Sequence, residues 1–247
     1  MGRVVTFADL SYREAASGVA RAAITAGDTK EMAAEVIRLA RGASVTETVP
    51  DGSDRYLFTL AGRVTVSGAG ESRTMEEEAF ATIQEGTRFT IANADGAGRA
   101  ADGAVATIVS VVAPPPGSGA KRAGFTGGVA LAARASTPVH DIPAEKKRRI
   151  YFVGQEAARS ERAHAMIVLY VRDTVTSLHM HPNAESMFVL LSGRTRFTVN
   201  GEDVVVERGQ ATYFPMGDRH GLRVADGEDG VSFLEFHVPA GFVTVRG

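Results

Sequence analysis

Apolar residues at every second position mark short segments along most of the chain. The runs "RVTVSG", "RTRFTVNGEDVVVERG" and "GVSFLEFHVP" are examples, and glycine, aspartate and asparagine separate such runs. A period of two is typical of β-strands, because alternate side chains of a strand face opposite sides. Helical patterning is confined to "ADLSYREAA" and "DTKEMAAEV", where we expect short helices. The pattern therefore predicts an all-β fold, a sandwich or barrel of mostly antiparallel strands.

The chain also contains an internal repeat. One constant shift along the sequence carries Gly62-Arg63 onto Gly193-Arg194 and Gly86 onto Gly217, with no gap between these anchors. Identities are sparse, but both copies have the same order of strand, glycine turn, strand and second glycine turn. Self-similarity of this kind indicates two structural units of one type.

A segment rich in proline, glycine and serine, "APPPGSGAKRAGFTGG", lies between the two copies and is typical of an exposed connector. We therefore divide the chain into an N-terminal unit (residues 1–118), a connector and packing segment (residues 119–160) and a C-terminal unit (residues 161–247). The one basic run, "EKKRR" from Glu145 to Arg149, falls in the middle segment, and we interpret it as a solvated linker.

Composition excludes several kinds of site and partner. The chain has no cysteine, so disulfides, thiolate metal ligands and cysteine nucleophiles are excluded. A net charge of −2 gives no strong field that attracts nucleic acid or acidic lipid. No apolar run approaches the roughly 18 residues that span a bilayer, and the N-terminus lacks the apolar core of a signal peptide. We expect a cytoplasmic protein with a small-molecule partner, no nucleic acid and no membrane, and we leave a homodimer open.

Three histidines form the most informative pattern in the C-terminal unit. His179 and His181 lie in "SLHMHPNAES", two positions apart, so both rings share one face of a strand. His220 follows a Pro-x-Gly turn that can return a third ring to the first two. Imidazole binds transition metals, and three such ligands on one face leave positions open for water and substrate. We predict one divalent transition metal per chain, with Fe, Mn, Ni, Zn and Cu as alternatives.

These residues resemble the two motifs of the cupin superfamily, G-x5-H-x-H-x3/4-E-x6-G and G-x5-P-x-G-x2-H-x3-N. The positions that match are His179, His181 and Gly193 in the first motif, and Gly209, Pro215, Gly217 and His220 in the second. Asp173 stands at the opening glycine of the first motif, and Val224 at the last position of the second. The resemblance implies a jelly-roll barrel for each unit, hence two cupin domains in tandem with few short helices.

The glutamate of the first motif is displaced by one residue. Counting back from Gly193 puts Ser186 at the family's glutamate position and Glu185 one residue early. A slip of one residue turns a side chain to the opposite face of a strand. Either a β-bulge near Pro182-Asn183 or beyond Glu185 turns the carboxylate inward, or three histidines hold the metal, as in some cupin oxygenases. We take Glu185 as a fourth ligand.

The N-terminal unit has no histidine at the matching positions. The shift that relates the two repeats places Thr48, Pro50, Asp54 and Phe89 opposite the four candidate ligands. We therefore interpret this unit as a metal-free barrel, with a pocket for a small molecule as an alternative.

Four further side chains have open interpretations. His237 and His164 lie on predicted strands and either orient a ligand and transfer protons or fill the core. Arg194 and Arg196 either hold an anionic substrate or face solvent.

The resemblance implies a metal-dependent enzyme acting on a small polar or carboxylated metabolite, with a dioxygenase as the favoured class. A metal-assisted hydrolase, lyase or isomerase is the first alternative. It is represented by ureidoglycine aminohydrolase, in which a glutamate stands where this chain has His179. Oxalate decarboxylase has a stretch similar to "HPNA" after its two histidines. A regulatory cupin that binds a small molecule without turnover is the second alternative.

Overall fold

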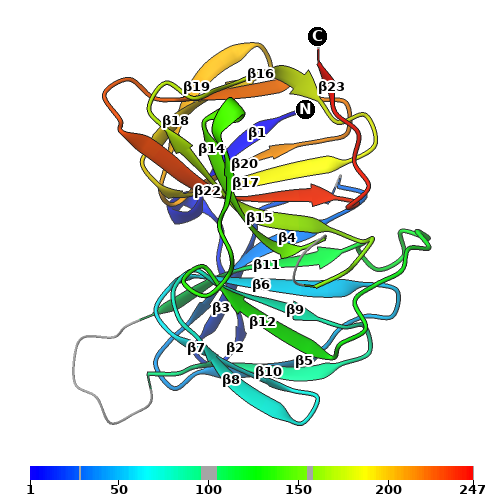
Figure 1. The fold of residues 1–247 in the computed structure, drawn as a ribbon. Helices are drawn as coiled ribbons and strands as arrows, with labels where there is room; N and C mark the ends of the chain where they lie inside the picture. Colours follow the sequence, from blue (N-terminus) through cyan, green and yellow to red (C-terminus); the bar gives the residue numbers. More distant parts are fainter. Residues whose placement is uncertain (28, 96–104, 155–157, 247) are drawn as a thin grey trace. The chain divides into compact units, whose positions relative to one another are not determined.

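The protein consists almost entirely of β-strands, as the computed structural model shows for residues 1–27, 29–95, 105–154 and 158–246 (Figure 1). Within these ranges the only helical elements are two single turns, η1 (Phe7–Asp9) and η2 (Pro143–Glu145). The prediction of an all-β fold is therefore confirmed.

The prediction of two short helices is wrong. "ADLSYREAA" forms η1 and then strand β2 (Arg13–Ala16). The second stretch leads into strand β4 (Ala33–Leu39), and its first residue, 28, lies outside the described residues. Strand β4 pairs along its length with two neighbouring strands, so sheet hydrogen bonds override the weak helical preference of this segment.

The chain folds into two compact units, each assembled from separate segments. The C-terminal barrel contains Met1–Asp9, Thr137–Ala157 and Ala163–Gly247, and the N-terminal barrel contains Leu10–Ser136 and Ala158–Arg162. The first strand of the chain thus belongs to the C-terminal barrel, which a linear division of the sequence does not describe.

The C-terminal barrel is made of two antiparallel sheets. The larger sheet has the order β1 (Arg3–Thr6), β20 (Gln210–Phe214), β17 (Glu185–Ser192), β22 (Gly230–Val238), β15 (His164–Val171), β14 (Lys147–Val153) and β13 (His140–Ile142). The smaller sheet has the order β19 (Glu202–Glu207), β18 (Arg194–Val199), β21 (His220–Val224), β16 (Val175–Met180) and β23 (Val245–Arg246).

The N-terminal barrel is also made of two antiparallel sheets, and its smaller sheet has one strand fewer. Its larger sheet has the order β12 (Val129–Ala133), β9 (Ala79–Ile83), β6 (Asp54–Ala61), β11 (Ala106–Ala113), β4, β3 (Val19–Ala23) and β2. Its smaller sheet has the order β5 (Ser44–Thr48), β10 (Arg88–Asn93), β7 (Val64–Gly68) and β8 (Glu71–Met75).

The internal repeat is confirmed at the level of strands. The shift that carries Gly62 onto Gly193 also carries β6 onto β17 and β9 onto β20, with identical ends. The edge strands are exchanged between the repeats. Strand β1 precedes the first repeat and pairs with β20, whereas β12 precedes the second repeat and pairs with β9.

Each barrel encloses its own apolar core. In the C-terminal barrel Phe188 and Phe233 of the larger sheet pack against Phe197 and Leu222 of the smaller one. The rings of Phe188 and Phe197 lie 5.2 Å apart, in the range of favourable aromatic pairs. Among the described residues, none belongs to a helix that is long and apolar enough to cross a membrane.

Glycines at the repeated turns meet a steric requirement. Gly62 and Gly193 both have left-handed φ values, at +75° and +71°. A Cβ atom on Gly193 would lie 2.4 Å from the carbonyl oxygen of Gly230, so a side chain has no room there. Asp173, which replaces the opening glycine of the motif, keeps a left-handed backbone with φ of 63°.

Gly193→Ala tests this requirement. We expect a loss of about 2–5 kcal/mol in the free energy of unfolding, because backbone strain and overlap with Gly230 add. Gly201→Ala is the matched control, since Gly201 has φ of +87° but open space around its Cβ position. It should cost only about 1–2 kcal/mol. Equal losses in thermal or urea unfolding of the two variants would contradict the steric argument.

Candidate metal centre

The three histidines of the motif meet in the interior of the C-terminal barrel. Strand β16 pairs with β21 so that His179 stands opposite His220, and His181 follows directly after β16. The ring centroids of His179 and His220 lie 4.4 Å apart. The three rings offer nitrogen atoms that all lie within 4.8 Å of one another, and all three residues are buried. The structure therefore brings together the three histidines that the spacing singled out as candidate ligands.

Backbone carbonyl groups hold all three rings in one tautomer. The Nδ1 atoms of His179, His181 and His220 donate to the carbonyl oxygens of Ser177 (2.8 Å), Val243 (3.0 Å) and Asp218 (3.1 Å), respectively. A carbonyl oxygen only accepts, so Nδ1 carries the hydrogen and the Nε2 lone pair is available. The Nε2 atoms of His181 and His220 are buried without a hydrogen-bond partner. Such orphaned acceptors, with the other ring nitrogen oriented by an outer partner, fit a metal ion.

Burial keeps the rings uncharged at neutral pH. Desolvation lowers the pKa of His181 to about 4 and that of His220 to about 3. It also lowers the pKa of His179. A metal binds the neutral imidazole, so no proton has to be displaced at pH 7. The donor set suits the divalent transition metals, and it does not distinguish among them.

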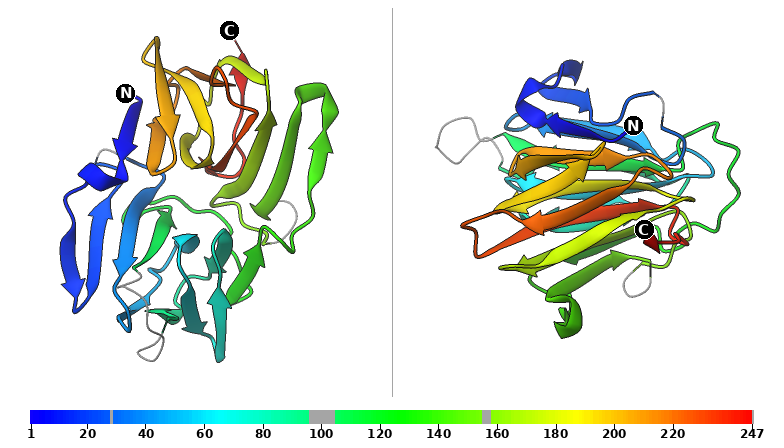
Figure 2. Two further views of the ribbon diagram at one scale, coloured as in Figure 1. Left: turned by 90° about the vertical axis from the view of Figure 1, so that its left-hand side faces the viewer. Right: turned by 90° about the horizontal axis from the view of Figure 1, so that it is seen from above.

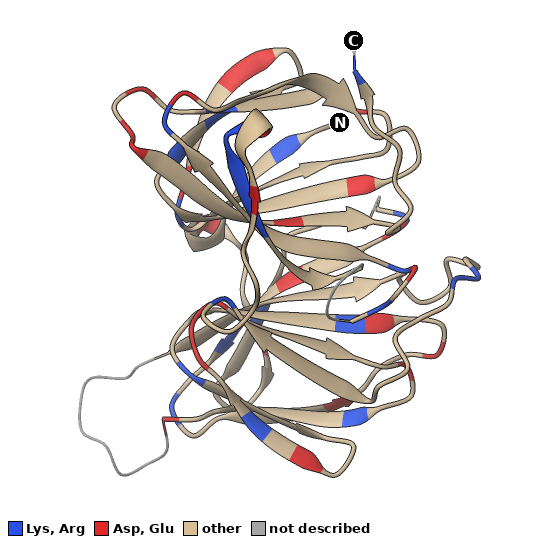
Figure 3. Ribbon diagram, viewed as in Figure 1, with Lys and Arg blue, Asp and Glu red and all other residues tan. Residues whose placement is uncertain are grey.

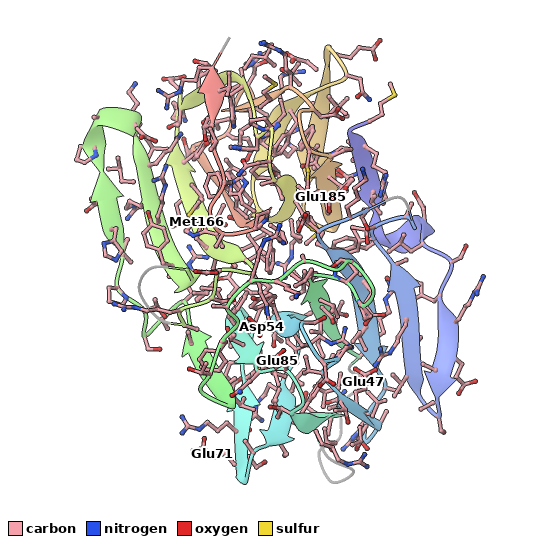
Figure 4. All side chains as sticks on the ribbon, turned by 90° about the vertical axis from the view of Figure 1, so that its right-hand side faces the viewer. Glu47, Asp54, Glu71, Glu85, Met166 and Glu185 are labelled. Carbon is pink, nitrogen blue, oxygen red and sulfur yellow. The ribbon has the colours of Figure 1, made fainter. Side chains whose placement is uncertain are left out.

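Glu185 is not part of this group. In β17 Ser186 stands opposite His237, whereas Glu185 stands opposite Val238. Because alternate residues of a strand face opposite sides, Glu185 points away from the face that carries Ser186 and Phe188. A register shift beyond Glu185 is present, between Leu190 and Ser192, but the pairing from Glu185 to Leu190 is regular, so the shift does not bring Glu185 to the face of Ser186 and Phe188. Glu185, at the start of β17, is labelled in Figure 4. The structure thus differs from our choice of Glu185 as a ligand.

His237 forms a short chain of hydrogen bonds beside the three histidines. Its Nε2 donates to Oε1 of Glu235 at 2.5 Å, and its Nδ1 lies 2.9 Å from Oγ of Ser186. Its ring centroid lies 4.5 Å from that of His181. Burial alone raises the pKa of the Glu235 carboxyl, but the hydrogen bond from His237 and nearby positive charges hold it at about 2. Glu235 is therefore a buried carboxylate at neutral pH.

His164 lies on β15, the strand next to the β22 strand that carries His237. It stands opposite His237 in the β15–β22 pair, and the two ring centroids are 6.4 Å apart. Desolvation lowers the pKa of His164 to about 4. Both histidines that the sequence singled out as outer partners therefore line the site, but neither belongs to the group of three.

A cavity of about 400 Å³ opens beside the histidines. Its size suits a small metabolite. Its polar and charged lining consists of Glu145, Lys147, Arg149, Tyr151, His164, Tyr170, Thr176, His179, His181, Glu235, His237, Thr244 and Arg246. Its apolar lining consists of Met166, Val168, Phe188, Leu222, Ala240 and Phe242.

The basic run from Glu145 to Arg149 is not the solvated linker expected from the sequence. It forms the end of η2 and the start of β14, an inner strand of the larger sheet. Lys147 and Arg149 both face the cavity, and Figure 3 shows basic residues along β14. The placing of Lys147, Arg149 and Tyr151 at alternate positions is a strand pattern. The run of charged residues made this segment look like a solvated linker instead. Arg194 and Arg196 instead form surface ion pairs, with Glu228 and Asp226.

The N-terminal barrel has no histidine at the positions that match the three imidazoles, and it contains an ion-pair network instead. The shift between the repeats carries Arg55 onto Ser186 and Phe89 onto His220. Arg55 contacts Glu35 at 3.2 Å and Glu47 at 2.6 Å, and Arg21 contacts the same two carboxylates. Glu47 is labelled in Figure 4. These charged groups form ion pairs with one another, although Nε of Arg21 is buried without a hydrogen-bond partner.

Comparison with known proteins gives the class to which this site belongs. Residues 166–237 match the family model described as a cupin domain. The C-terminal barrel is thus a cupin domain, and the chain has the fold of a two-domain cupin protein.

Solved structures with the same fold cover nearly the whole chain. Protein Ylba from E. coli has a TM-score of 0.75 and 10% identity, over 99% of this chain and 93% of that chain. A putative glyoxylate-induced protein from Pseudomonas aeruginosa has a TM-score of 0.76 and 14% identity, over 100% and 91%. A deletion mutant of oxalate decarboxylase from Bacillus subtilis has a TM-score of 0.70 and 14% identity, over 98% and 78%. A search of the curated proteins by sequence finds no match.

His181→Ala should remove the metal. We expect wild-type protein to hold about one transition-metal ion per chain. Loss of a residue that only orients a ligand lowers metal affinity by ~10–100-fold, and loss of a ligand itself should lower it further. His140→Ala is the matched control, because His140 lies outside the group of three. Elemental analysis after reconstitution measures the result, and equal metal content in both variants would overturn the assignment.

The variant Glu185→Gln tests whether three histidines hold the metal alone or together with Glu185. The substitution preserves size and removes the charge, and we expect metal content and affinity to stay close to those of wild type, since the carboxylate faces away from the imidazoles. Loss of the metal in this variant would show that Glu185 reaches the ion.

Proposed function

We propose that the C-terminal barrel is the catalytic unit of a metal-dependent enzyme acting on a small polar or carboxylated metabolite. The observation that carries this proposal is the convergence of three neutral imidazoles, each oriented through its Nδ1 atom, beside a cavity of about 400 Å³. Three ligands leave coordination positions open for substrate, as a catalytic site requires. A bound divalent metal would polarise a substrate oxygen or activate dioxygen there.

The protein's own residues would then bind the substrate and control protons. Glu235 accepts a hydrogen bond from Nε2 of His237, so it orients that ring and keeps a negative charge inside the cavity. Phe242 stacks on His237 at 4.0 Å and contacts His181, so it keeps water from that side of the site.

A dioxygenase is the reaction class that we favour. The support is the donor set, because three histidines without a carboxylate resemble the metal sites of some cupin oxygenases. Two structurally similar proteins are named after two-carbon acids, oxalate and glyoxylate. Those names support a small acidic substrate for this chain, in a cavity that carries positive side chains.

The second candidate is a metal-assisted hydrolase, lyase or isomerase. The observation that favours it is Glu235, a buried carboxylate that lines the cavity and is oriented by His237. Such a fixed negative charge can orient His237 and stabilise positive charge that develops during proton transfer, without any oxidant. A regulatory cupin without turnover is the remaining alternative.

Oxygen uptake distinguishes these classes. The protein is reconstituted with metal without oxygen and then mixed with a panel of small carboxylates with and without dioxygen. Oxygen consumption in step with product formation is the expected result. Turnover without oxygen that falls by about 10²–10⁴-fold in Glu235→Gln would support the second candidate instead. Saturable binding without turnover would support the regulatory alternative.

A further inference from the structure

One wall of the cavity is made by a strand that lies outside the matched cupin domain. Strand β14 pairs with β15 so that Lys147, Arg149 and Tyr151 stand opposite Tyr170, Val168 and Met166, respectively. These side chains face the cavity at every second position. Figure 2 shows the β13–β14 hairpin at the edge of the larger sheet of the C-terminal barrel. The cupin match begins at residue 166, so β14 lies outside the matched residues.

The wall carries more positive than negative charge. Glu145 uses one oxygen, Oε2, for both Lys147 at 3.1 Å and Arg149 at 3.2 Å. One carboxylate of the wall therefore faces two cations, and Arg149 also interacts with Glu235. Arg246, on β23, adds a third cation to the cavity lining.

Charge in the whole cavity is also unbalanced. Its lining contains three cations and two carboxylates, Glu145 and Glu235, which leaves one net positive charge. A divalent metal would raise this to three. Positive charge at a partly desolvated site is unfavourable without a partner, so the cavity is complementary to an anion with more than one negative charge.

Arg149 is the arginine of this wall that lines the cavity. A terminal nitrogen contacts Glu145, the guanidinium group also interacts with Tyr151 and Glu235, and its Nε atom is buried without a hydrogen-bond partner. The guanidinium group is a rigid fork of donors that matches a carboxylate. Lys147 lies beside it on the same face, with only 10% of its side chain exposed.

We propose that Arg149, assisted by Lys147, binds an acidic group of the substrate remote from the metal, and that the substrate is a small dianion. One acidic end lies at the three histidines and the other at β14. This inference rests on the proposed function, because it places one end of the substrate at the metal. It makes β14 the part of the protein that selects dianions over monoanions.

Equilibrium binding tests the proposal. Protein reconstituted with Co²⁺ is titrated with malonate, succinate, acetate and the neutral malonamide, and affinities are measured by calorimetry. The cobalt absorption spectrum reports contact at the metal. We expect a dicarboxylate to bind more tightly than acetate, and malonamide to bind more weakly than malonate.

The variant Arg149→Gln should weaken the affinity for the dicarboxylate by about 10- to 100-fold, to the level of acetate, because a charged hydrogen-bonded pair is lost. Its affinity for acetate should not change. Arg148→Gln is the matched control, because Arg148 is the preceding residue in β14, is half exposed and does not line the cavity. Melting temperature and cobalt content show that each variant is folded and loaded.

Two results would overturn the proposal. The first is that neither dicarboxylate binds wild-type protein more tightly than acetate does. The second is that the Arg149→Gln and Arg148→Gln variants bind the dicarboxylate with equal affinity. Failure of the proposed function is visible separately, because it appears as absent cobalt or as absent turnover. Titration of metal-free protein still measures the part of dicarboxylate affinity that depends on Arg149.

Discussion

The pairing of β16 with β21 places His179 opposite His220, and the geometry of the site depends on this register. Backbone carbonyl groups accept hydrogen bonds from the Nδ1 atoms of all three rings. Each ring is therefore fixed in the tautomer that has its lone pair on Nε2. One of these carbonyls belongs to Val243, in the segment after the last long strand. Because Phe242 of the same segment stacks on His237, the chain's final residues both orient a ligand ring and cover the site.

The two barrels show how one topology supports different interiors. Their larger sheets have the same construction, and β6 and β9 correspond to β17 and β20 from end to end. In the C-terminal barrel the Nε2 atoms of His181 and His220 are buried acceptors without a hydrogen-bond partner. In the N-terminal barrel Arg21 and Arg55 instead form ion pairs with Glu35 and Glu47. Neutral imidazoles with a lone pair that lacks a donor can take a cation, whereas these arginines are cations already paired with carboxylates.

Strand parity explains where sequence reasoning succeeded and where it failed. The spacing of His179 and His181 was sufficient, because two residues on one strand share a face. Glu185 was misplaced, because the choice between Glu185 and Ser186 depends on the register of β17 against β22. Lys147 and Arg149 were overlooked, because a charged run without apolar alternation resembles a linker until its neighbours are known. Only the pairing of β14 with β15 shows that its alternate residues face inward.

Local and periodic properties followed from the amino-acid sequence alone. These are the β class, the internal repeat, the glycine turns and the three histidines, since each depends on neighbouring residues or on spacing along the chain. The tertiary structure decided every feature that requires two distant strands to meet. The exchange of β1 and β12, the outward direction of Glu185 and the cationic wall beside Glu235 are of this kind. Register between distant segments is set by packing and hydrogen bonding of the whole sheet, and no single segment contains that information.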